Sequence, residues 1–590
     1  MDRRQVHLAA TESEAALTHR LSGAASWGLW LLLAAVSCGL YALLAWLSWR
    51  FEYTDAFADR PIPAVLAVLG AAFVVYLLAV RLAACFPLRR GQLGFLIAAG
   101  LAYRLILLPT PPIQEIDIYR YLWDGNVVRQ GISPYRYPPR VVLQTQRDRV
   151  LDVPLARLAA LRDANPHLRT VLERIHYGEV PSVYPPVSQA VFAAAAWSTP
   201  EHATVEQRMT ILKIWFAACD LATVGLLLLL LRQTQRPPGL CIIYAWCPLV
   251  LKEFSNSGHL DAVAVALTTL AIWLAVRSVV KPGPGHPTAP SSAGTSRFCE
   301  GLTAMAACVA LALAVGAKLY PIWLFPLLAA SVLRRLGRTC CLAAIAVFLV
   351  TAIVVLWPLL PEFGHCRQSQ AGAVNSAQAA CAPRPAAADP SLGLRTFLTR
   401  WEMNDFLFMM ALENLLPADA QREGRRPWFS VVPQTPREAL IGPLAERTGG
   451  DRWQAAFFVA RAVSLLATVA IAAWCVGRTL RNPDVAVWLE SAFLTLAWFW
   501  FLSPTLNPWY WTWALPLLAF ARSRVWLATS GVVLLYYLRF WFIYQFPDTP
   551  LAGTPYSGAA FFDFVVTWCE FGPWLAGLIV SLVIRRRRAA

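Results

Sequence analysis

Fourteen apolar runs, each of roughly 17–25 residues, dominate this chain and are long enough to cross a lipid bilayer as helices. Of the 590 residues, 57% are apolar and 15% are charged, a balance that excludes a soluble multidomain enzyme. We therefore predict an all-α integral membrane protein, a polytopic bundle of about 14 transmembrane helices. The runs begin near Trp27, Ile62, Gly91, Met209, Leu240, Gly258, Leu302, Leu319, Cys340, Gln454, Val485, Trp509, Val525 and Phe561.

Basic residues set the predicted orientation, because Lys and Arg collect in cytoplasmic loops. A fifteenth apolar segment, Val187 to Trp197, is only about eleven residues long and too short to cross. If it does not cross, the basic clusters between the runs all fall on the side of Arg3 and Arg4. The net charge of +16 is then a topology signal rather than a sign of nucleic-acid binding, and both termini are predicted to be cytoplasmic.

This topology divides the chain into six parts and turns two long segments outward. The second of these is predicted to be flexible around Gln368 to Asp389 and structured near Leu394 to Leu416, and its Cys366 and Cys381 could form a disulfide. The parts are a cytoplasmic tail (1–24), three helices (25–108), a first outer loop (109–208), central helices (209–360), a second outer loop (361–453), and C-terminal helices with a basic tail (454–590).

Near the start of the first outer loop, the segment Gln114 to Gly125 contains candidate catalytic carboxylates and candidate binding aromatics. Glu115 and Asp117 stand where the chain leaves the bilayer, and low-dielectric surroundings there can raise a carboxylate pKa into the working range of a general base. Tyr119 and Trp123 provide aromatic surface suited to the headgroup level or to a sugar ring. An ordinary interfacial loop with an aromatic belt explains the segment equally well.

Ionisable residues inside the apolar runs lie toward the predicted outer ends of their helices, where they could hold an anionic headgroup. For any single Lys or Arg, snorkelling to the interface is the simpler explanation. His259 and Asp261 open a helix, so Asp261 could simply complement the helix N-terminus; one His near one Asp is weak evidence for a metal. Asp220 and Glu490 lie deeper and are expected to pair with basic neighbours. The outer residues are Arg104, Lys213, Lys252, Glu253, His259, Asp261, Lys318, Arg461 and Arg539.

Another helix is predicted to open with Asn507, Trp509 and Tyr510, a dense aromatic group beside a polar amide. Aromatic-belt enrichment explains part of this density. A platform for a carbohydrate or a polyprenyl chain explains it as well, because flat apolar sugar faces stack on indoles. Both interpretations stay open.

Together these residues resemble a bacterial integral-membrane glycosyltransferase of the C superfold, and among them the polyprenol-phosphate-mannose-dependent mannosyltransferases. The resemblance covers roughly residues 91–521, although two additional helices precede the usual start of the module. The pieces that carry it are Asp117-Ile-Tyr-Arg-Tyr-Leu-Trp-Asp-Gly125, Gly131-Ile-Ser-Pro-Tyr135, Tyr184-Pro-Pro186, Pro248 through Gly258-His-Leu-Asp261, Lys318-Leu-Tyr-Pro321 and Asn507-Pro-Trp-Tyr510.

The resemblance implies a polyprenyl-phosphate-sugar donor, with mannose as the sugar, and an acceptor hydroxyl on a glycan, lipid or protein. It implies that Asp117 is the general base, with Glu115 as the neighbouring candidate. Binding of the donor phosphate or sugar falls to Arg120, Lys252, His259, Asp261 and Lys318. Acceptor or lipid contacts fall to Tyr119, Trp123, Tyr184, Asn507, Trp509 and Tyr510.

The resemblance further implies a bacterial inner (plasma) membrane, with the active site on the extracytoplasmic face. A divalent cation is compatible with it, but no acidic cluster requires one. The alternative function is a flippase or transporter of a lipid-linked sugar or another solute, which would distribute charges along a path through the membrane midplane. The one-sided charges and the absence of an internal repeat disfavour that alternative.

Overall fold

The computed structural model describes residues 23–147, 151–278, 293–360, 389–421 and 426–589. Within these ranges the chain is helical and contains no strand; two isolated bridges are the only β-type pairs there. The predicted disulfide between Cys366 and Cys381, and the stretch expected to be flexible up to residue 388, lie outside the described residues. The all-α prediction is confirmed for the described part.

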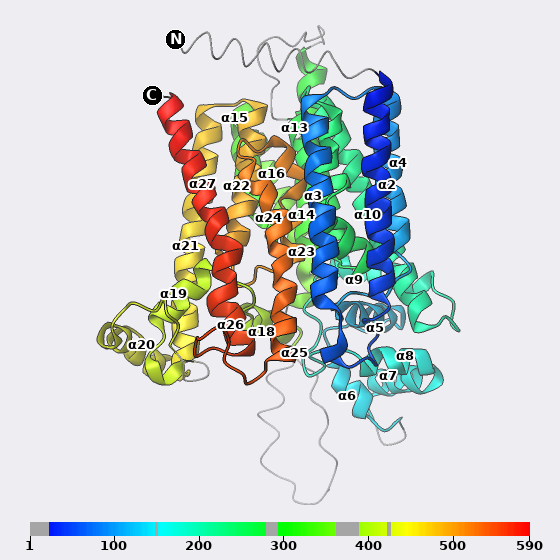
Figure 1. Ribbon diagram of the computed structural model, residues 1–590, viewed down its shortest axis with the longest axis vertical. Coiled ribbons are helices and arrows are strands. Elements are labelled where there is room, and N and C mark those ends of the chain that lie inside the picture. The colour runs from blue at the N-terminus through cyan, green and yellow to red at the C-terminus, as the bar shows by residue number, and fades with distance from the viewer. Residues whose placement is uncertain (1–22, 148–150, 279–292, 361–388, 422–425, 590) are drawn as a thin grey trace, which may run out of the picture.

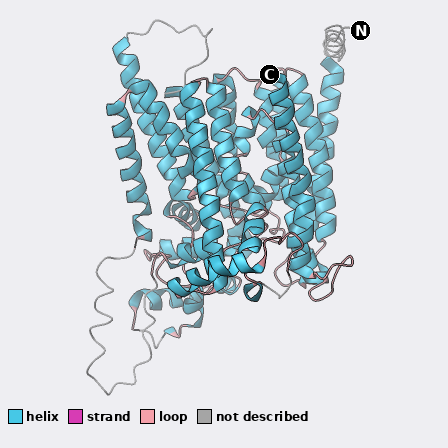
Figure 2. Ribbon diagram, turned by 90° about the vertical axis from the view of Figure 1, so that its left-hand side faces the viewer, coloured by secondary structure: helices cyan, strands magenta, loops and turns pink. Residues whose placement is uncertain are grey.

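Ten helical segments of the described chain are long and apolar enough to cross a membrane. They correspond to ten of the fourteen predicted runs and stand roughly side by side in the bundle (Figures 1 and 2). Eight are α2 (Gly23–Ser48), α3 (Ile62–Cys85), α10 (Val205–Gln233), α13 (Asp261–Ser278), α14 (Ala293–Ala317), α16 (Arg338–Leu356), α21 (Arg452–Arg481) and α22 (Val485–Leu502). The other two join α24 (Val525–Val532) to α25 (Leu538–Gln545), and α26 (Gly558–Phe561) to α27 (Thr567–Ala589).

The remaining four runs fold differently, so the number of crossings stays a prediction. The run from Gly91 forms α4 (Arg90–Leu107), a helix of 18 residues. Prolines divide the other three into short helical pieces, because a proline ring removes a hydrogen bond and clashes with the preceding turn. The pieces are η3 (Pro238–Cys241), α11 (Ile242–Ala245), α12 (Pro248–Val250), η4 (Leu251–Asn256), η5 (Tyr320–Leu324), α15 (Phe325–Leu336), α23 (Pro508–Trp511) and η9 (Leu515–Phe520).

Two of these broken runs lie in the protein interior. Every residue of α11, α12 and η4 is buried, and so is every residue from Pro508 to Phe520. Irregular backbone is tolerated at membrane depth where protein rather than lipid surrounds it. These segments therefore bring polar side chains into the bundle.

The short helices of the two predicted outer segments gather at one end of the bundle, opposite the first turn of α2 and the last turn of α27 (Figure 1). Helix α9 has 12 residues, fewer than the roughly 17 needed for a crossing, and packs on α5 and α14. These helices are α5 (Asp117–Arg129), α6 (Pro139–Gln144), α7 (Val153–Ala164), α8 (Pro166–Glu173), α9 (Pro186–Trp197), α18 (Leu392–Arg400), α19 (Leu407–Leu415) and α20 (Gln434–Thr448).

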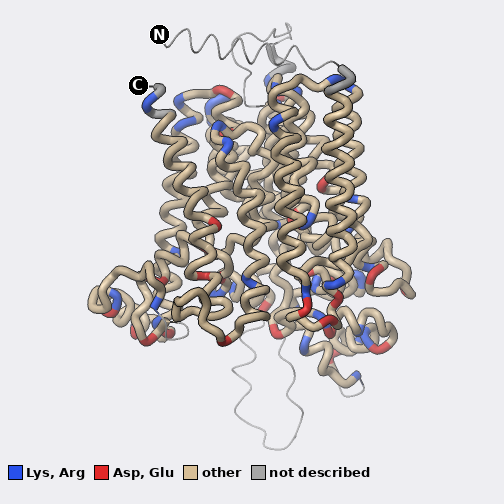
Figure 3. Tube along the Cα trace, in the orientation of Figure 1, with Lys and Arg blue, Asp and Glu red and all other residues tan. Residues whose placement is uncertain are grey.

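Charged residues mark both ends of the bundle, while its middle carries few of them (Figure 3). Those at the end where α27 finishes are mostly Lys and Arg, whereas the opposite end mixes both signs of charge. As expected, the two deeper carboxylates are paired: Asp220 with Arg104 at 2.6 Å, and Glu490 with Arg478 and Arg522. Pairing offsets the large cost of an isolated charge in an apolar bundle.

Candidate active site

The loop between α4 and α5 carries the two predicted carboxylates and is anchored on several sides. Gln114 has φ 65°, a left-handed conformation that is uncommon for a residue other than glycine. Its side chain accepts a hydrogen bond from Arg60 at 3.1 Å and donates one to Tyr544 at 2.6 Å. The backbone N–H of Ile113 donates to Asn256 at 2.9 Å. The strained turn just before Glu115 is therefore held from three other parts of the chain.

Both carboxylates have free hydrogen-bonding capacity. Asp117 is the first residue of α5, is partly exposed, and receives no side-chain hydrogen bond from the described residues. The Oε1 atom of Glu115 is buried and has no hydrogen-bond partner in the described chain. Burial raises the pKa of Glu115 to about 7, whereas Lys252 and His259 lower it. A carboxyl group with such a pKa can change its protonation state near neutral pH.

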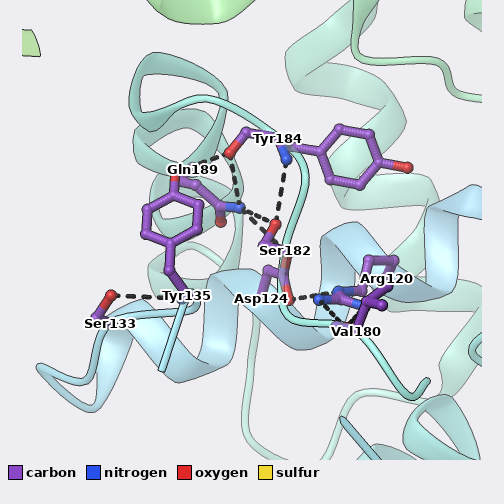
Figure 4. A network of polar contacts seen from close by, with 8 residues as sticks. All are labelled: Arg120, Asp124, Ser133, Tyr135, Val180, Ser182, Tyr184 and Gln189. Atoms are coloured by element: carbon purple, nitrogen blue, oxygen red, sulfur yellow. Dashed lines mark hydrogen bonds and ion pairs between the residues drawn. The ribbon is translucent and has the colours of Figure 1, made fainter. Parts of the chain in front are cut away.

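Buried polar side chains of α5 form hydrogen bonds with α9 and with the loop before it (Figure 4). Arg120 donates to Asp124, one turn later, at 2.9 Å and to the carbonyl oxygen of Val180. The amide of Gln189 on α9 donates to the other oxygen of Asp124 at 3.1 Å and to Ser182 at 2.7 Å. The hydrogen bonds of Arg120 thus hold α5 against the loop before α9. Its binding of the donor phosphate or sugar stays a prediction.

A π-helical turn in the bundle interior, η4, supplies the next group of charges. Lys252 contacts both Glu253, at 3.3 Å, and the hydroxyl of Tyr537. Tyr537 donates to the other oxygen of Glu253 at 2.8 Å. The Nε2 atom of His259 lies 3.3 Å from Glu253 without hydrogen-bond geometry. Such single π-helical turns occur often at functional sites, and this one presents buried charge towards Glu115.

Asp261 and Lys318 form a second charged pair nearby. The Lys318 ammonium lies 2.9 Å from Asp261, whose other oxygen accepts a hydrogen bond from the indole of Trp513 at 2.6 Å. Asp261 is buried at the start of α13, whereas the Lys318 side chain keeps 16% of its exposure. The ammonium also sits 4.4 Å from the ring centre of Tyr510. Asp261 therefore does more than complement a helix N-terminus, because it fixes the position of Lys318.

The aromatic residues predicted to bind acceptor or lipid occupy three different environments. Trp509 stacks on His259 with ring centres 4.0 Å apart, and Tyr510 stacks on Trp513 at 4.3 Å. Trp123 is 1% exposed and lies in the apolar core. Tyr119 meets Tyr53 edge to face and lines the same cavity as Glu115, and Tyr184 lies near Asp117. The side chain of Asn507 is buried with an unpartnered Oδ1.

The structure brings the predicted site residues of four distant segments into one region. Burial raises the pKa of Tyr184, and the charge of Asp117 raises it further. The charges of Lys252 and His259 lower the pKa of Glu115. Four cations predicted to join this set make other contacts. Arg104 pairs with Asp220, and Lys213 donates to the backbone of Thr110 at 2.6 Å, so both satisfy buried polar groups of the bundle. Arg461 donates to the backbone of Leu398, and Arg539 pairs with Asp563 at 3.0 Å.

Several residues of the site were missing from the predicted set. Asp124 follows Arg120 by four residues, a spacing that indicates an ion pair on one helix face. Trp513 belongs to the aromatic run that begins at Trp509, but nothing in the sequence pointed to Asp261 as its hydrogen-bond partner. The contact of Tyr537 with Lys252 and Glu253 could not be predicted, because Tyr537 is one of several aromatic residues in an apolar run. Among the described residues, no group of three or more His, Cys, Asp or Glu side chains is placed to hold a metal ion.

A comparison with known proteins gives one match. Residues 20–334 match the family model for alpha-(1->6)-mannopyranosyltransferase, N-terminal domain. This range covers more than half of the chain and includes Glu115, Asp117 and every site residue up to Lys318. No curated protein and no solved structure matches the chain.

Proposed function

Because the chain belongs to the alpha-(1->6)-mannopyranosyltransferase family, we propose that it transfers mannose from a polyprenyl-phosphate donor to a hydroxyl group of an acceptor. Membership of this family makes it a glycosyltransferase, and its apolar helices make it a multi-pass membrane protein. The donor, the acceptor and the roles of individual residues are our proposal. One observation carries it: the free carboxylates of Glu115 and Asp117 lie in the same region as the charges of Lys252, His259 and Lys318.

The proposed reaction is a direct displacement at the anomeric carbon of mannose. Asp117 accepts the proton of the acceptor hydroxyl, and the oxygen forms the new bond to the anomeric carbon. The bond from that carbon to the phosphate oxygen breaks with inversion, and polyprenyl phosphate leaves. Asp117 suits this role because its carboxylate is partly exposed and receives no side-chain hydrogen bond from the described chain.

The leaving phosphate needs positive charge nearby. The Lys318 side chain keeps 16% of its exposure, whereas Lys252 and His259 are buried, and Asp261 and Trp513 hold Lys318 in place. We assign Lys318 to direct contact with the phosphate, while Lys252 and His259 add a favourable field from the buried side. Glu115 in its ionised form accepts a hydrogen bond from the acceptor and so orients it towards Asp117.

Membrane orientation supports a reaction on the extracytoplasmic face. Helix α5, which begins at Asp117, lies at the end of the bundle opposite the last turn of α27, where the charged residues are mostly Lys and Arg (Figures 1 and 3). Since basic residues favour the cytoplasmic side, the end with α5 faces outward in our proposal. A polyprenyl donor fits such a site, because its tail stays in the bilayer while its phosphate reaches the interface.

The test is a transfer assay with purified protein and radiolabelled mannose carried either by polyprenyl phosphate or by a nucleoside diphosphate. We expect transfer from the lipid donor alone, and a KM for that donor raised about tenfold or more by Lys318→Ala, the loss of one charge-assisted contact. Arg335→Ala is the matched control, because Arg335 pairs with Glu300 away from the site. Transfer from the nucleotide donor alone would contradict the proposal.

A further inference from the structure

A cavity of about 290 Å³ opens beside Glu115, close to the lower end of the range of about 300–1,000 Å³ typical of small-molecule sites. One wall comes from the loop that joins α2 to α3, and the others come from the 111–119 segment and from the ends of α8 and α10. The two N-terminal helices, which the resemblance left without a role, thus reach the catalytic region through their connecting loop.

Aromatic rings and a guanidinium group form the open part of this cavity. Arg174 lies between Tyr53 and Tyr119, with its guanidinium carbon 5.0 Å from one ring centre and 5.6 Å from the other. It also donates to the Tyr119 hydroxyl at 3.2 Å. Tyr53 keeps 40% of its exposure, although it meets Tyr119 edge to face. The exposed ring of Tyr53 beside the guanidinium of Arg174 suits a sugar ring, which has flat C–H faces and hydroxyl edges.

The charge of the lining argues against an anionic ligand. Two cations, Arg60 and Arg174, face three carboxylates, Glu52, Glu115 and Glu206. Arg60 is buried and already donates to Gln114 and to the backbone of Glu52. When Glu115 is ionised, as the proposed reaction requires, a phosphate group would meet net negative charge here, whereas a neutral ligand with many hydroxyl groups finds both donors and acceptors.

The same loop also fixes the catalytic segment. Arg60, at its end, holds Gln114 in its left-handed conformation, and Gln114 directly precedes Glu115. Glu115 lies at the boundary: it lines the cavity on one side and interacts with Lys252 and His259 on the other. A hydroxyl group presented from the cavity would therefore meet Glu115 before it meets Lys252 and His259.

We propose that this cavity, walled by the α2–α3 loop, binds the non-reducing end of the acceptor saccharide and presents its hydroxyl to Glu115, two residues before the proposed base Asp117. The inference rests on the proposed transferase function and assigns the acceptor side of the same site. The donor enters from the other side, where Lys318, His259 and Trp509 lie. The helices α2 and α3, expected from the resemblance to be additions, lie within the residues that the family model matches, and their connecting loop thereby provides acceptor recognition.

The test compares Tyr53→Ala, which removes an exposed ring from the cavity, with Trp46→Ala as a control. Trp46 is a 65% exposed aromatic residue on α2 that does not line the cavity. With α-(1→6)-linked mannotriose as acceptor, we expect Tyr53→Ala to raise the acceptor KM about tenfold and leave the KM of the lipid donor unchanged. Trp46→Ala should change neither constant. An unchanged acceptor KM in Tyr53→Ala would overturn the inference.

A binding measurement separates this inference from the proposed reaction. Saturation-transfer NMR with mannotriose and the purified proteins needs no turnover. Binding to the wild type and its loss in Tyr53→Ala supports the cavity as a saccharide site, even if no mannose is transferred. Equal binding by both proteins places the saccharide elsewhere and overturns the inference, while transfer by the wild type would leave the proposed reaction standing.

Discussion

Glu115 and Asp117 are two residues apart, yet they meet different surroundings. Asp117 is partly exposed at the start of α5, whereas one oxygen of Glu115 is buried beside Lys252 and His259. Different surroundings allow two neighbouring carboxylates to take different tasks. We assign proton abstraction to Asp117 and orientation of the acceptor to ionised Glu115.

This assignment predicts a pH dependence. Burial raises the pKa of Glu115 to about 7, so its carboxylate is lost as the pH falls through that value. We expect kcat/KM to rise with pH through an apparent pKa near 7, and this limb to disappear in Glu115→Gln. Initial rates measured from pH 5 to 9, an interval of roughly two units on each side, test it. If kcat/KM of Glu115→Gln still rises with pH through the same range, another group titrates there and the assignment to Glu115 is wrong.

The buried pair Arg104–Asp220 carries a prediction about stability. Both side chains are almost fully buried, at 1% and 0% exposure. Removing one partner leaves an uncompensated charge, so Asp220→Asn should destabilise the fold by about 3–5 kcal/mol. Glu300→Gln breaks the more exposed pair with Arg335 and should cost less than about 1 kcal/mol. Thermal unfolding in detergent compares the two, and similar melting temperatures would contradict the interpretation.

At the scale of elements, the position of α5 depends on its close contact with α9. A Cβ atom on Gly125 would lie 2.3 Å from the carbonyl oxygen of Phe192, so no side chain fits between these helices. We expect Gly125→Ala to destabilise the protein by about 1–3 kcal/mol and to lower kcat by displacing Asp117. Gly94→Ala on α4 is the control, because its Cβ would meet nothing within 4 Å. Equal stability and activity of the two variants would refute the close contact.

The sequence predicts the elements better than their interactions. Length and hydropathy located the apolar runs, and the short 187–197 segment was correctly expected to fall below the length of a crossing. Hydropathy alone could not predict that the runs around Pro248 and Pro508 form short buried pieces rather than continuous helices, because an apolar interior and a lipid tail select the same residues.

The site was predictable in its residue types but not in its contacts. Lys252 and His259 stood out as ionisable groups inside apolar runs, and Asp117 stood out as a carboxylate where the chain leaves the bilayer. The contact of Asp261 with Lys318 and Trp513 joins positions 57 and 252 residues apart, and no local pattern reports such pairing. The cavity wall from the α2–α3 loop was missed for the same reason.

At the scale of the whole molecule, the account predicts one orientation in the membrane. Asp55, in the α2–α3 loop, lies on the side of α5, and Cys85 ends α3 at the opposite side. In a variant with all other cysteines replaced, a membrane-impermeant thiol reagent applied to intact cells should label Asp55→Cys. Native Cys85, which is exposed, should react only after permeabilisation. The reverse labelling would place the site in the cytoplasm.

The most direct test of the central claim is mannosyl transfer from synthetic polyprenyl-phosphate-mannose by purified wild type and Asp117→Asn. General-base catalysis is worth about 10²–10⁴-fold, so the variant should lose turnover by about that factor. Its melting temperature should stay unchanged, because the Asp117 side chain receives no hydrogen bond from the described chain. An Asp117→Asn variant with near-normal turnover would contradict the account.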